Sequence, residues 1–340
     1  MRFKVTSRGN HSTCGDLFFS LPTQQALEWA TEQVAQLCRE KAQGIHRERL
    51  EEELARMQER GAAFHFLLMQ EVCQLSPGGI MLQGDTAGSL ISKYLGLSAL
   101  DVLDPMLVEN NLSTPTEFIW GLPGSGKLPV LDACIHPDCR EQIHRQLDSK
   151  YGRTAADDNL FRQIGLIDRH KTVRSQQVPA YTPQLCLAVL HQEARDTAAH
   201  TQALFEEGAI HKDLLESILS LTREMLELQE CDLPTLVRLY GYLRGNFTGR
   251  RQIQNLREPY FFTTREELYQ MLLALEMPKA EALDMVKQGV WSQGKKRDGY
   301  IARLQNYNAP ASLLDAFSRT DNIWSAASIL SRIHFLMQTI

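Results

Sequence analysis

Residues 121–127, GLPGSGK, have the G-x-x-x-x-G-K spacing of a loop that cradles phosphates. Such a loop needs Ser or Thr after its lysine to bind Mg²⁺, and then a helix whose N-terminus faces the phosphates. Here Leu128 and Pro129 follow the lysine, and the residues after them are typical of a strand. We therefore interpret 121–127 as a glycine-rich turn between two strands. ATP binding through Lys127 is the less favoured alternative.

Potential zinc ligands crowd into a short segment between residues 134 and 144. Structural zinc sites usually combine two pairs of ligands, with two to four residues between the cysteines of a pair. Only one close cysteine pair exists in this chain, so the second pair is missing. We therefore assign no metal to this segment, whose candidate ligands are Cys134, His136, Asp138, Cys139 and His144.

Two segments carry basic residues that could contact a phosphate backbone. In the first, arginines are interleaved with aromatic residues that could stack on bases. The second is a run of charges between two glycines, which is typical of a loop. A solvated helix face with core aromatics explains the first segment equally well. The candidate DNA-binding residues are Arg244, Arg250, Arg251, Arg257, Lys295, Lys296 and Arg297.

Hydrophobic spacing predicts the elements of the first half of the chain. Alternating residues and turn signals over 1–22 indicate a β-hairpin, and apolar residues at helical spacing predict amphipathic helices over about 23–37 and 47–60. An almost wholly apolar stretch over 62–72 predicts a buried helix, followed by a turn and a strand at 80–82. Residues 84–96 place a glycine-containing turn before another helix.

The second half is predicted to be mostly helical. Helical spacing with Gly or Pro breaks covers 203–229, 232–244, 264–275, 278–289, 311–317 and 322–339. We place a domain boundary near residue 200, which gives an N-terminal hairpin (1–22), a mixed domain (23–200) and a helical region (201–340). The predicted fold class is α+β.

Composition excludes several classes of protein. The chain has 340 residues, 43% hydrophobic and 23% charged, as in a folded globular protein. Its net charge is −5, so any nucleic-acid contact must be a local patch. Seven cysteines, an odd number, fit a reducing compartment. With no signal-peptide pattern and no long apolar stretch, we expect a cytoplasmic protein without a membrane partner.

The order of several motifs resembles the palm and fingers of C-family bacterial replicative DNA polymerases, the PolC type of polymerase III alpha subunit. Residues 37–68 resemble the helices that enter the palm, and 84–90 (GDTAGSL) lie at the place of the loop that holds the incoming triphosphate. Residues 129–132 (PVLD) occupy the place of P-D-I-D, and 157–162 (DDNLFR) resemble E-D-N-V-Y-R. The likeness covers roughly residues 25–340.

Further segments extend the resemblance. Residues 185–190 (LCLAVL) are similar to the family's L-K-L-D-I-L strand, and 264–335 resemble its helical fingers. The resemblance implies a nucleotidyltransferase-like palm followed by fingers. The fingers segment F-P-K-A-H is shortened around 320–324, without its Lys and His.

The resemblance also implies that the catalytic site is lost. Polymerase chemistry needs three carboxylates to hold two divalent metals about 4 Å apart. Their places fall on Val130, Asp132 and Ala188, so that only Asp132 remains. We therefore expect no cofactor and no polymerase activity; Mg²⁺ would bind only if Asp157, Asp158, Glu193 or Asp196 rebuilt the site.

The implied triphosphate loop has lost its positive charge as well. Its remnant residues are Gly84, Asp85, Gly88 and Ser89, and no Lys or Arg occurs from 79 through 92. A turn followed by a helix N-terminus is the favoured explanation of these residues. The leading hypothesis is a non-catalytic polymerase-like protein that binds DNA or a replisome protein. The alternatives are an active nucleotidyltransferase and a protein-interaction module without DNA binding.

Overall fold

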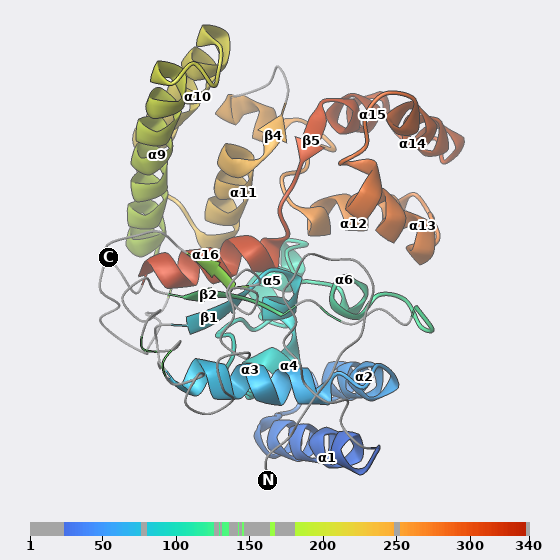
Figure 1. The fold of residues 1–340 in the computed structure, drawn as a ribbon. Coiled ribbons are helices and arrows are strands. Elements are labelled where there is room, and N and C mark those ends of the chain that lie inside the picture. The colour runs from blue at the N-terminus through green and yellow to red at the C-terminus, as the bar shows by residue number, and fades with distance from the viewer. Residues whose placement is uncertain are drawn as a thin grey trace. The chain divides into compact units, whose positions relative to one another are not determined.

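A computed structural model describes residues 24–75, 80–125, 129, 131–135, 142, 145, 164–166, 181–247 and 252–337. Helices form most of this part of the chain (Figure 1). The chain divides into two compact units. Unit 1 is Met1–Leu103, Thr116–Val178 and His334–Thr339, and unit 2 is Asp104–Pro115, Pro179–Ile333 and Ile340. The predicted hairpin at 1–22 lies outside the described residues.

Three helices open unit 1: α1 (Gln24–Lys41), α2 (His46–Glu59) and α3 (Ala63–Leu75). In α2 the predicted apolar stripe of Leu50, Leu54 and Met57 is buried, which confirms the helical spacing. The α1 helix buries Ala30, Val34 and Cys38 in the same manner. The three helices and the strand after them agree with the sequence prediction.

A three-stranded sheet follows, formed by β1 (Ile80–Gln83), β2 (Asp132–Ile135) and β3 (Ile164–Leu166) in that order. The β1–β2 pair is antiparallel and the β2–β3 pair is parallel. A 3₁₀ turn, η1 (Asp85–Gly88), leads from β1 into the short helix α4 (Leu90–Tyr94). The glycine turn and the helix predicted for 84–96 are therefore confirmed.

Residues 118–120 belong to a helix, α6 (Thr116–Trp120). We expected a strand before the glycine-rich turn at 121–127, and that expectation is wrong. The apolar run was too short for its spacing to distinguish a strand from a buried helical turn. Phe118, Ile119 and Trp120 are all buried, and Trp120 stacks on Phe66 of α3. This packing of α6 against α3 stabilises residues 118–120 as a helix.

The long helix α9 (Pro183–Glu206) in unit 2 replaces the strand that the resemblance implied for 185–190, so that expectation is wrong. Thr182 caps the helix by accepting a hydrogen bond from the Leu185 N–H (3.2 Å), and Pro183 fits the first helical turn. The buried residues Cys186, Val189 and Leu190 follow the helical period. Residue 200, where we placed the domain boundary, lies inside α9, whereas the units change at 178/179.

The remaining elements of unit 2 are mostly the predicted helices. The 264–275 segment begins with a capping box, in which the Thr264 and Glu267 side chains each accept a hydrogen bond from the other's backbone N–H. Strand β4 (Asn246–Phe247) pairs antiparallel with β5 (Thr320–Asn322). The helices and turns are α5 (Pro105–Glu109), α10 (Lys212–Leu226), α11 (Leu233–Arg244), η2 (Ile253–Arg257), α12 (Arg265–Ala274), α13 (Lys279–Asp284), η3 (Met285–Gly289), α14 (Lys295–Asn306) and α15 (Ala311–Ser318). The last helix, α16 (Ala326–Met337), begins in unit 2, and its residues from His334 on belong to unit 1.

The α14 helix corrects a second expectation. We predicted a loop at Lys295–Arg297 because charges and two glycines surround it, but these residues form the first turn of α14. Tyr300 and Leu304 are buried on one side of this helix. The stabilisation from their packing exceeds the low helix propensity of the glycine at 299. Within the described residues, no helix is long and apolar enough to cross a membrane.

Candidate functional site

Strand register brings Asp132 next to the glycine loop at residue 84. Asp132 begins β2 and pairs with Gln83, the last residue of β1. Gly84 follows at once, with φ of 78°, a conformation that glycine adopts without strain. The backbone therefore places the remnant carboxylate position and the remnant triphosphate loop at the same end of the sheet.

An internal carboxylate occupies the helix start that follows this loop. Glu53 of α2 is fully buried and accepts a hydrogen bond from the Ser89 hydroxyl and from the Leu90 N–H (3.3 Å). Arg49 Nε lies 2.8 Å from Glu53 Oε1, the oxygen that also accepts from the Leu90 N–H. The Ser89 hydroxyl also caps α4 by accepting from the Ile91 N–H (3.1 Å). Because Glu53 already supplies the negative charge that the α4 N-terminus attracts, a phosphate has no place there.

The glycine-rich turn at 121–125 is satisfied in the same way. The Gly124 N–H donates to the Glu59 carboxylate (2.9 Å), and Arg60 donates to the Leu122 carbonyl (2.9 Å). A helix, α6, precedes the turn in place of the strand that a phosphate loop requires. Lys127 lies outside the described residues.

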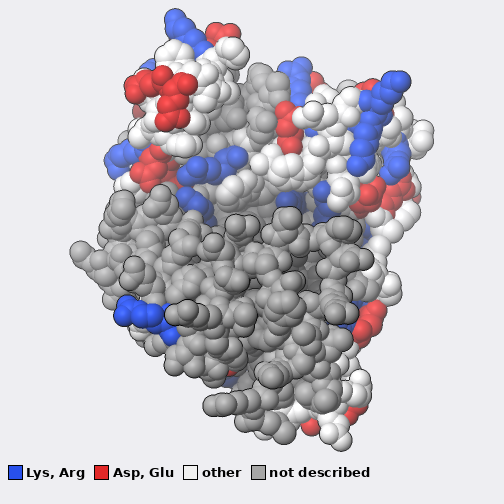
Figure 2. Space-filling view, in the orientation of Figure 1, with Lys and Arg blue, Asp and Glu red and all other residues white. Residues whose placement is uncertain are grey.

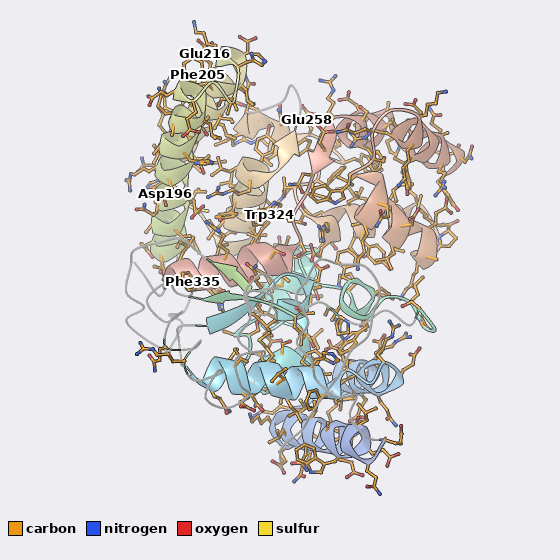
Figure 3. The ribbon with its side chains drawn as sticks, viewed as in Figure 1. Asp196, Phe205, Glu216, Glu258, Trp324 and Phe335 are labelled. Atoms are coloured by element: carbon orange, nitrogen blue, oxygen red, sulfur yellow. The ribbon has the colours of Figure 1, made fainter. Side chains whose placement is uncertain are left out.

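The described acidic residues do not rebuild a metal site. Ala188 lies in α9, and Val130, Asp157 and Asp158 lie outside the described residues. Asp196, which Figure 3 labels on α9, accepts a hydrogen bond from Gln192 (2.8 Å). In the described part of the chain, no group of three or more His, Cys, Asp or Glu is arranged to hold a metal ion.

The described thiols are buried and protonated. Burial raises the pKa of Cys38, Cys73 and Cys231 to about 12 and that of Cys186 to about 11. Thiols with such pKa values are poor nucleophiles and poor metal ligands at neutral pH. Of the candidate zinc ligands, Cys134 lies on β2, and the other four lie outside the described residues.

Arg244 is an internal ion-pair partner. Its guanidinium lies 2.6 Å from the carboxylate of Glu193, which is fully buried, and 5.8 Å from the ring of Tyr240. Arg332 lies 4.0 Å from the same carboxylate. Arg244 therefore neutralises a buried charge, and its contact with DNA stays a prediction. Arg257 is exposed at the end of η2, and Arg250 and Arg251 lie outside the described residues.

Arg297 is also an internal residue, only 8% exposed. Its guanidinium donates to the backbone carbonyls of Val290, Ser292 (2.7 Å) and Ser318 (3.0 Å), and it pairs with Asp321 at 3.1 Å. These bonds use the planar fork of the guanidinium, which a lysine could not reproduce. Arg297 therefore fixes the chain at 290–292, and its contact with phosphate stays a prediction.

We call residues 290–296 the Trp291 turn. This segment begins with the residues that Arg297 fixes and ends with the first two residues of α14. It follows η3, one turn of π-helix in which the Val290 N–H donates to the Met285 carbonyl (3.2 Å). A Cβ atom on Gly289 would lie 3.0 Å from the Tyr300 ring and 3.1 Å from the Phe317 ring, so glycine lets both rings pack against the turn. The Ser292 hydroxyl donates to the Gly289 carbonyl at 2.5 Å. The turn is thus held from both sides.

The Trp291 turn displays an aromatic ring close in sequence to two positive charges. Trp291 is 49% exposed, the most exposed of the four tryptophans. Lys295 and Lys296 are exposed at the first two positions of α14, where positive charge is unfavourable for helix stability. Figure 2 shows lysine and arginine side chains gathered where Figure 1 places α14 and α15. Asp298, one turn further, is the nearest acidic residue in sequence.

Sequence reasoning found the two lysines but missed Trp291. A tryptophan at the end of a helical stretch normally signals core packing, and the π turn that precedes it has no sequence pattern of its own. The lysines at the start of a helix after Gly294 were the available signal. Comparison with models of known protein families and with curated proteins gives no match to this chain.

Proposed function

We propose that this protein binds single-stranded nucleic acid through the Trp291 turn and does not transfer nucleotides. The observation that carries the proposal is the half-exposed Trp291 followed by Lys295 and Lys296 on a turn fixed by buried Arg297. Bases stack on exposed aromatic rings in any sequence, and lysines neutralise the adjoining phosphates. A binding surface confined to this turn is compatible with the net charge of −5 of the whole chain.

The absence of nucleotide transfer is proposed from the loop at 84–89. Glu53 occupies the α4 N-terminus, where a triphosphate would need positive charge. Ala188, the place of the third carboxylate, lies on a helix. Both observations favour a binding protein over a nucleotidyltransferase with a rebuilt metal site.

We further propose that unit 1 descends from the palm domain of a polymerase. The support is the pairing of Gln83 with Asp132, which brings the glycine loop and the surviving carboxylate position together as catalysis by a palm would require. The helical 264–337 region then corresponds to fingers. The break in this correspondence is at 185–190, where a helix replaces a strand.

The proposal is tested by measuring the binding of a fluorescein-labelled oligothymidylate of twelve nucleotides, and of a labelled primer–template, to the protein. Fluorescence anisotropy at 50 and 200 mM salt gives both affinities. Trp291→Ala should weaken oligothymidylate binding by about 1–3 kcal/mol, the worth of one stacked base. Trp291→Phe should retain most of the affinity. Mg²⁺ and deoxynucleotides should leave binding unchanged.

The lysines are tested by the salt dependence. Two phosphate contacts to a single strand contribute about −1.4 to the slope of log affinity against log salt. Lys295→Gln with Lys296→Gln should remove that contribution, whereas Lys212→Gln with Arg223→Gln, the same charge change on exposed positions of α10, should not. Equal effects of the two pairs would contradict binding at the turn. Mg²⁺-dependent primer extension that is lost in Asp132→Ala would contradict the non-catalytic proposal.

A further inference from the structure

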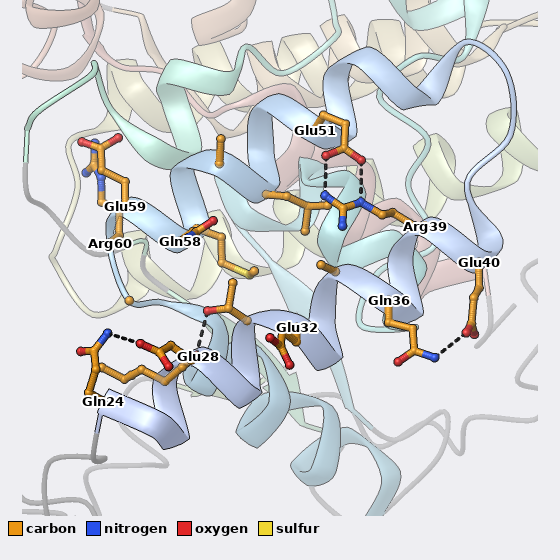
Figure 4. A pocket seen from close by; sticks show the side chains of 17 residues that line it. Gln24, Glu28, Glu32, Gln36, Arg39, Glu40, Glu51, Gln58, Glu59 and Arg60 are labelled. Carbon is orange, nitrogen blue, oxygen red and sulfur yellow. Dashed lines mark hydrogen bonds and ion pairs between the residues drawn. The ribbon is translucent and has the colours of Figure 1, made fainter.

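A groove of about 1,090 Å³ runs between α1 and α2 in unit 1 (Figure 4). Its α1 side is one continuous face of the helix, from Gln24 to Glu40 in steps of three and four residues. Its α2 side extends from Glu51 to Gly61. With 18 residues, α1 is about 27 Å long, so the groove offers about five helical turns of surface.

Negative charge lines the groove. Five glutamates and two arginines are among its lining residues. On α1, Glu28 and Glu40 accept hydrogen bonds from the amides of Gln24 and Gln36 (2.9 Å each), which leave the carboxylate charge in place. Glu32 lies between them on the same face (Figure 4). These three glutamates form a row along the helix.

The arginines of the groove do not cancel this row. Arg39 is held by Glu51 through two hydrogen bonds of 2.7 Å, so its charge is matched within that pair. Arg60 donates to the neutral Leu122 carbonyl (2.9 Å) and keeps its positive charge. Five glutamates against two arginines still leave the groove with a net negative charge.

The base of the groove is apolar and partly made of small residues. Ala35, Leu54 and Met57 are buried, and Leu27 is half-buried. Ala55 is exposed on the α2 side. Small side chains let a third helix approach two packed helices closely, as in ridges-into-grooves packing.

We infer that this groove binds a basic amphipathic helix of a partner protein. Lysines or arginines spaced by four residues on that helix would face Glu28, Glu32 and Glu40, while its small apolar residues would lie over Ala35 and Ala55. Charge complementarity identifies the occupant as cationic, and phosphate groups of a nucleic acid would be repelled. The groove is thus a second binding surface, independent of the Trp291 turn.

The test uses a labelled 18-residue helical peptide with lysines at every fourth position on one face and Ala and Leu on the other, titrated with the full chain. We expect binding that weakens at least tenfold in the Glu28→Gln, Glu32→Gln, Glu40→Gln triple variant. The matched control neutralises three exposed glutamates outside the groove, Glu48→Gln, Glu109→Gln and Glu230→Gln, and should change the affinity less than twofold. Circular dichroism and thermal melting verify that both variants are folded.

Two further outcomes would overturn the inference. Equal weakening in both triple variants would mean attraction to the general charge of the chain. Equally tight binding of a peptide with the same composition but lysines scattered around the helix would mean that the face of α1 is not recognised. A peptide with glutamates in place of lysines should not bind.

Discussion

Glu53 shows how a single carboxylate can occupy the anion site at the start of a helix. It is the last of three consecutive glutamates and the one that faces inward, where it meets Ser89 and Arg49. The apolar stripe of α2 was predictable from Leu50, Leu54 and Met57. The burial of Glu53 was not, because Ser89 and Leu90 lie 36 and 37 residues away at the start of α4, and only the tertiary structure brings them to Glu53.

Replacing Glu53 should therefore be costly. Glu53→Ala takes the fully buried carboxylate away from the partly buried Arg49 and removes an acceptor from the α4 N-terminus, so we expect the free energy of unfolding to fall by about 3–5 kcal/mol. The matched control is Glu51→Ala, two residues earlier, which breaks an exposed pair with Arg39 and should cost about 0–1 kcal/mol. Urea unfolding of both variants measures the difference. Similar losses would refute an internal role for Glu53.

His334 predicts a loss of stability in acid. Burial lowers the pKa of His334 to about 4, whereas the unfolded chain has an ordinary histidine pKa of about 6.5. The unfolded state therefore binds the proton first, and the stability linked to this group is complete above pH 6.5 and falls as the pH drops toward 4. We expect a decrease of about 2–3 kcal/mol, measured by urea unfolding at pH 7 and pH 4.5. His334→Asn should show a smaller difference between these pH values.

At the scale of elements, helices with a clear apolar face were predictable, whereas the helical state of α6 and the starts of α9 and α14 were not. The Thr182–Pro183 start of α9 is a helix signal, but an apolar run at 185–190 matches a buried strand equally well. The glycine at 299 and the charges at 295–297 obscured α14, whose stability depends on Tyr300 and Leu304 packing inside unit 2. Distant contacts decided each of these cases.

The helical state of residue 188 gives a direct prediction. Ala188→Asp restores the carboxylate that the polymerase resemblance calls for, but it places that carboxylate on α9. We expect no Mg²⁺-dependent primer extension and no rise in melting temperature at millimolar Mg²⁺. Metal binding gained by this variant would favour the active-site alternative.

The role of Arg297 is tested at the scale of the turn that it fixes. Arg297→Lys keeps the positive charge but loses the fork that bonds three backbone carbonyls, so we expect a loss of about 1–3 kcal/mol in stability together with weaker oligothymidylate binding. Lys296→Arg should change neither property. Unaltered stability and binding in Arg297→Lys would show that charge alone matters at this position.

At the scale of the whole molecule, each unit has its own buried ion-pair cluster. Unit 1 contains the Glu53–Arg49 pair, and unit 2 contains Glu193 with Arg244 and Arg332. Chain segments cross between the units at 103/104, 115/116, 178/179 and 333/334. The composition predicted a folded chain of domain size, but it held no information about these repeated crossings.

Hydrogen exchange should separate the two units. Glu53→Ala should speed amide exchange in α1, α2 and α4, and Glu193→Ala should speed it in α9 and α11, because local opening follows local stability. Leu50→Ile and Leu236→Ile are mild controls for packing in the same helices. Uniform acceleration across the chain in both variants would show that the two units open as one.

The π turn at Met285–Gly289 has a geometric consequence for the surface that follows it. Each residue of an α-helix rotates the chain by about 100°, so a five-residue hydrogen-bonded turn shifts the phase of all later side chains relative to an uninterrupted α-helix. Removing one residue from this turn, such as the exposed Gln288, would restore the α-helical phase and rotate position 291 by about a quarter turn. The outward direction of Trp291 therefore depends on the number of residues in the preceding turn. An insertion or deletion in that turn should alter the direction of Trp291 more than a substitution does.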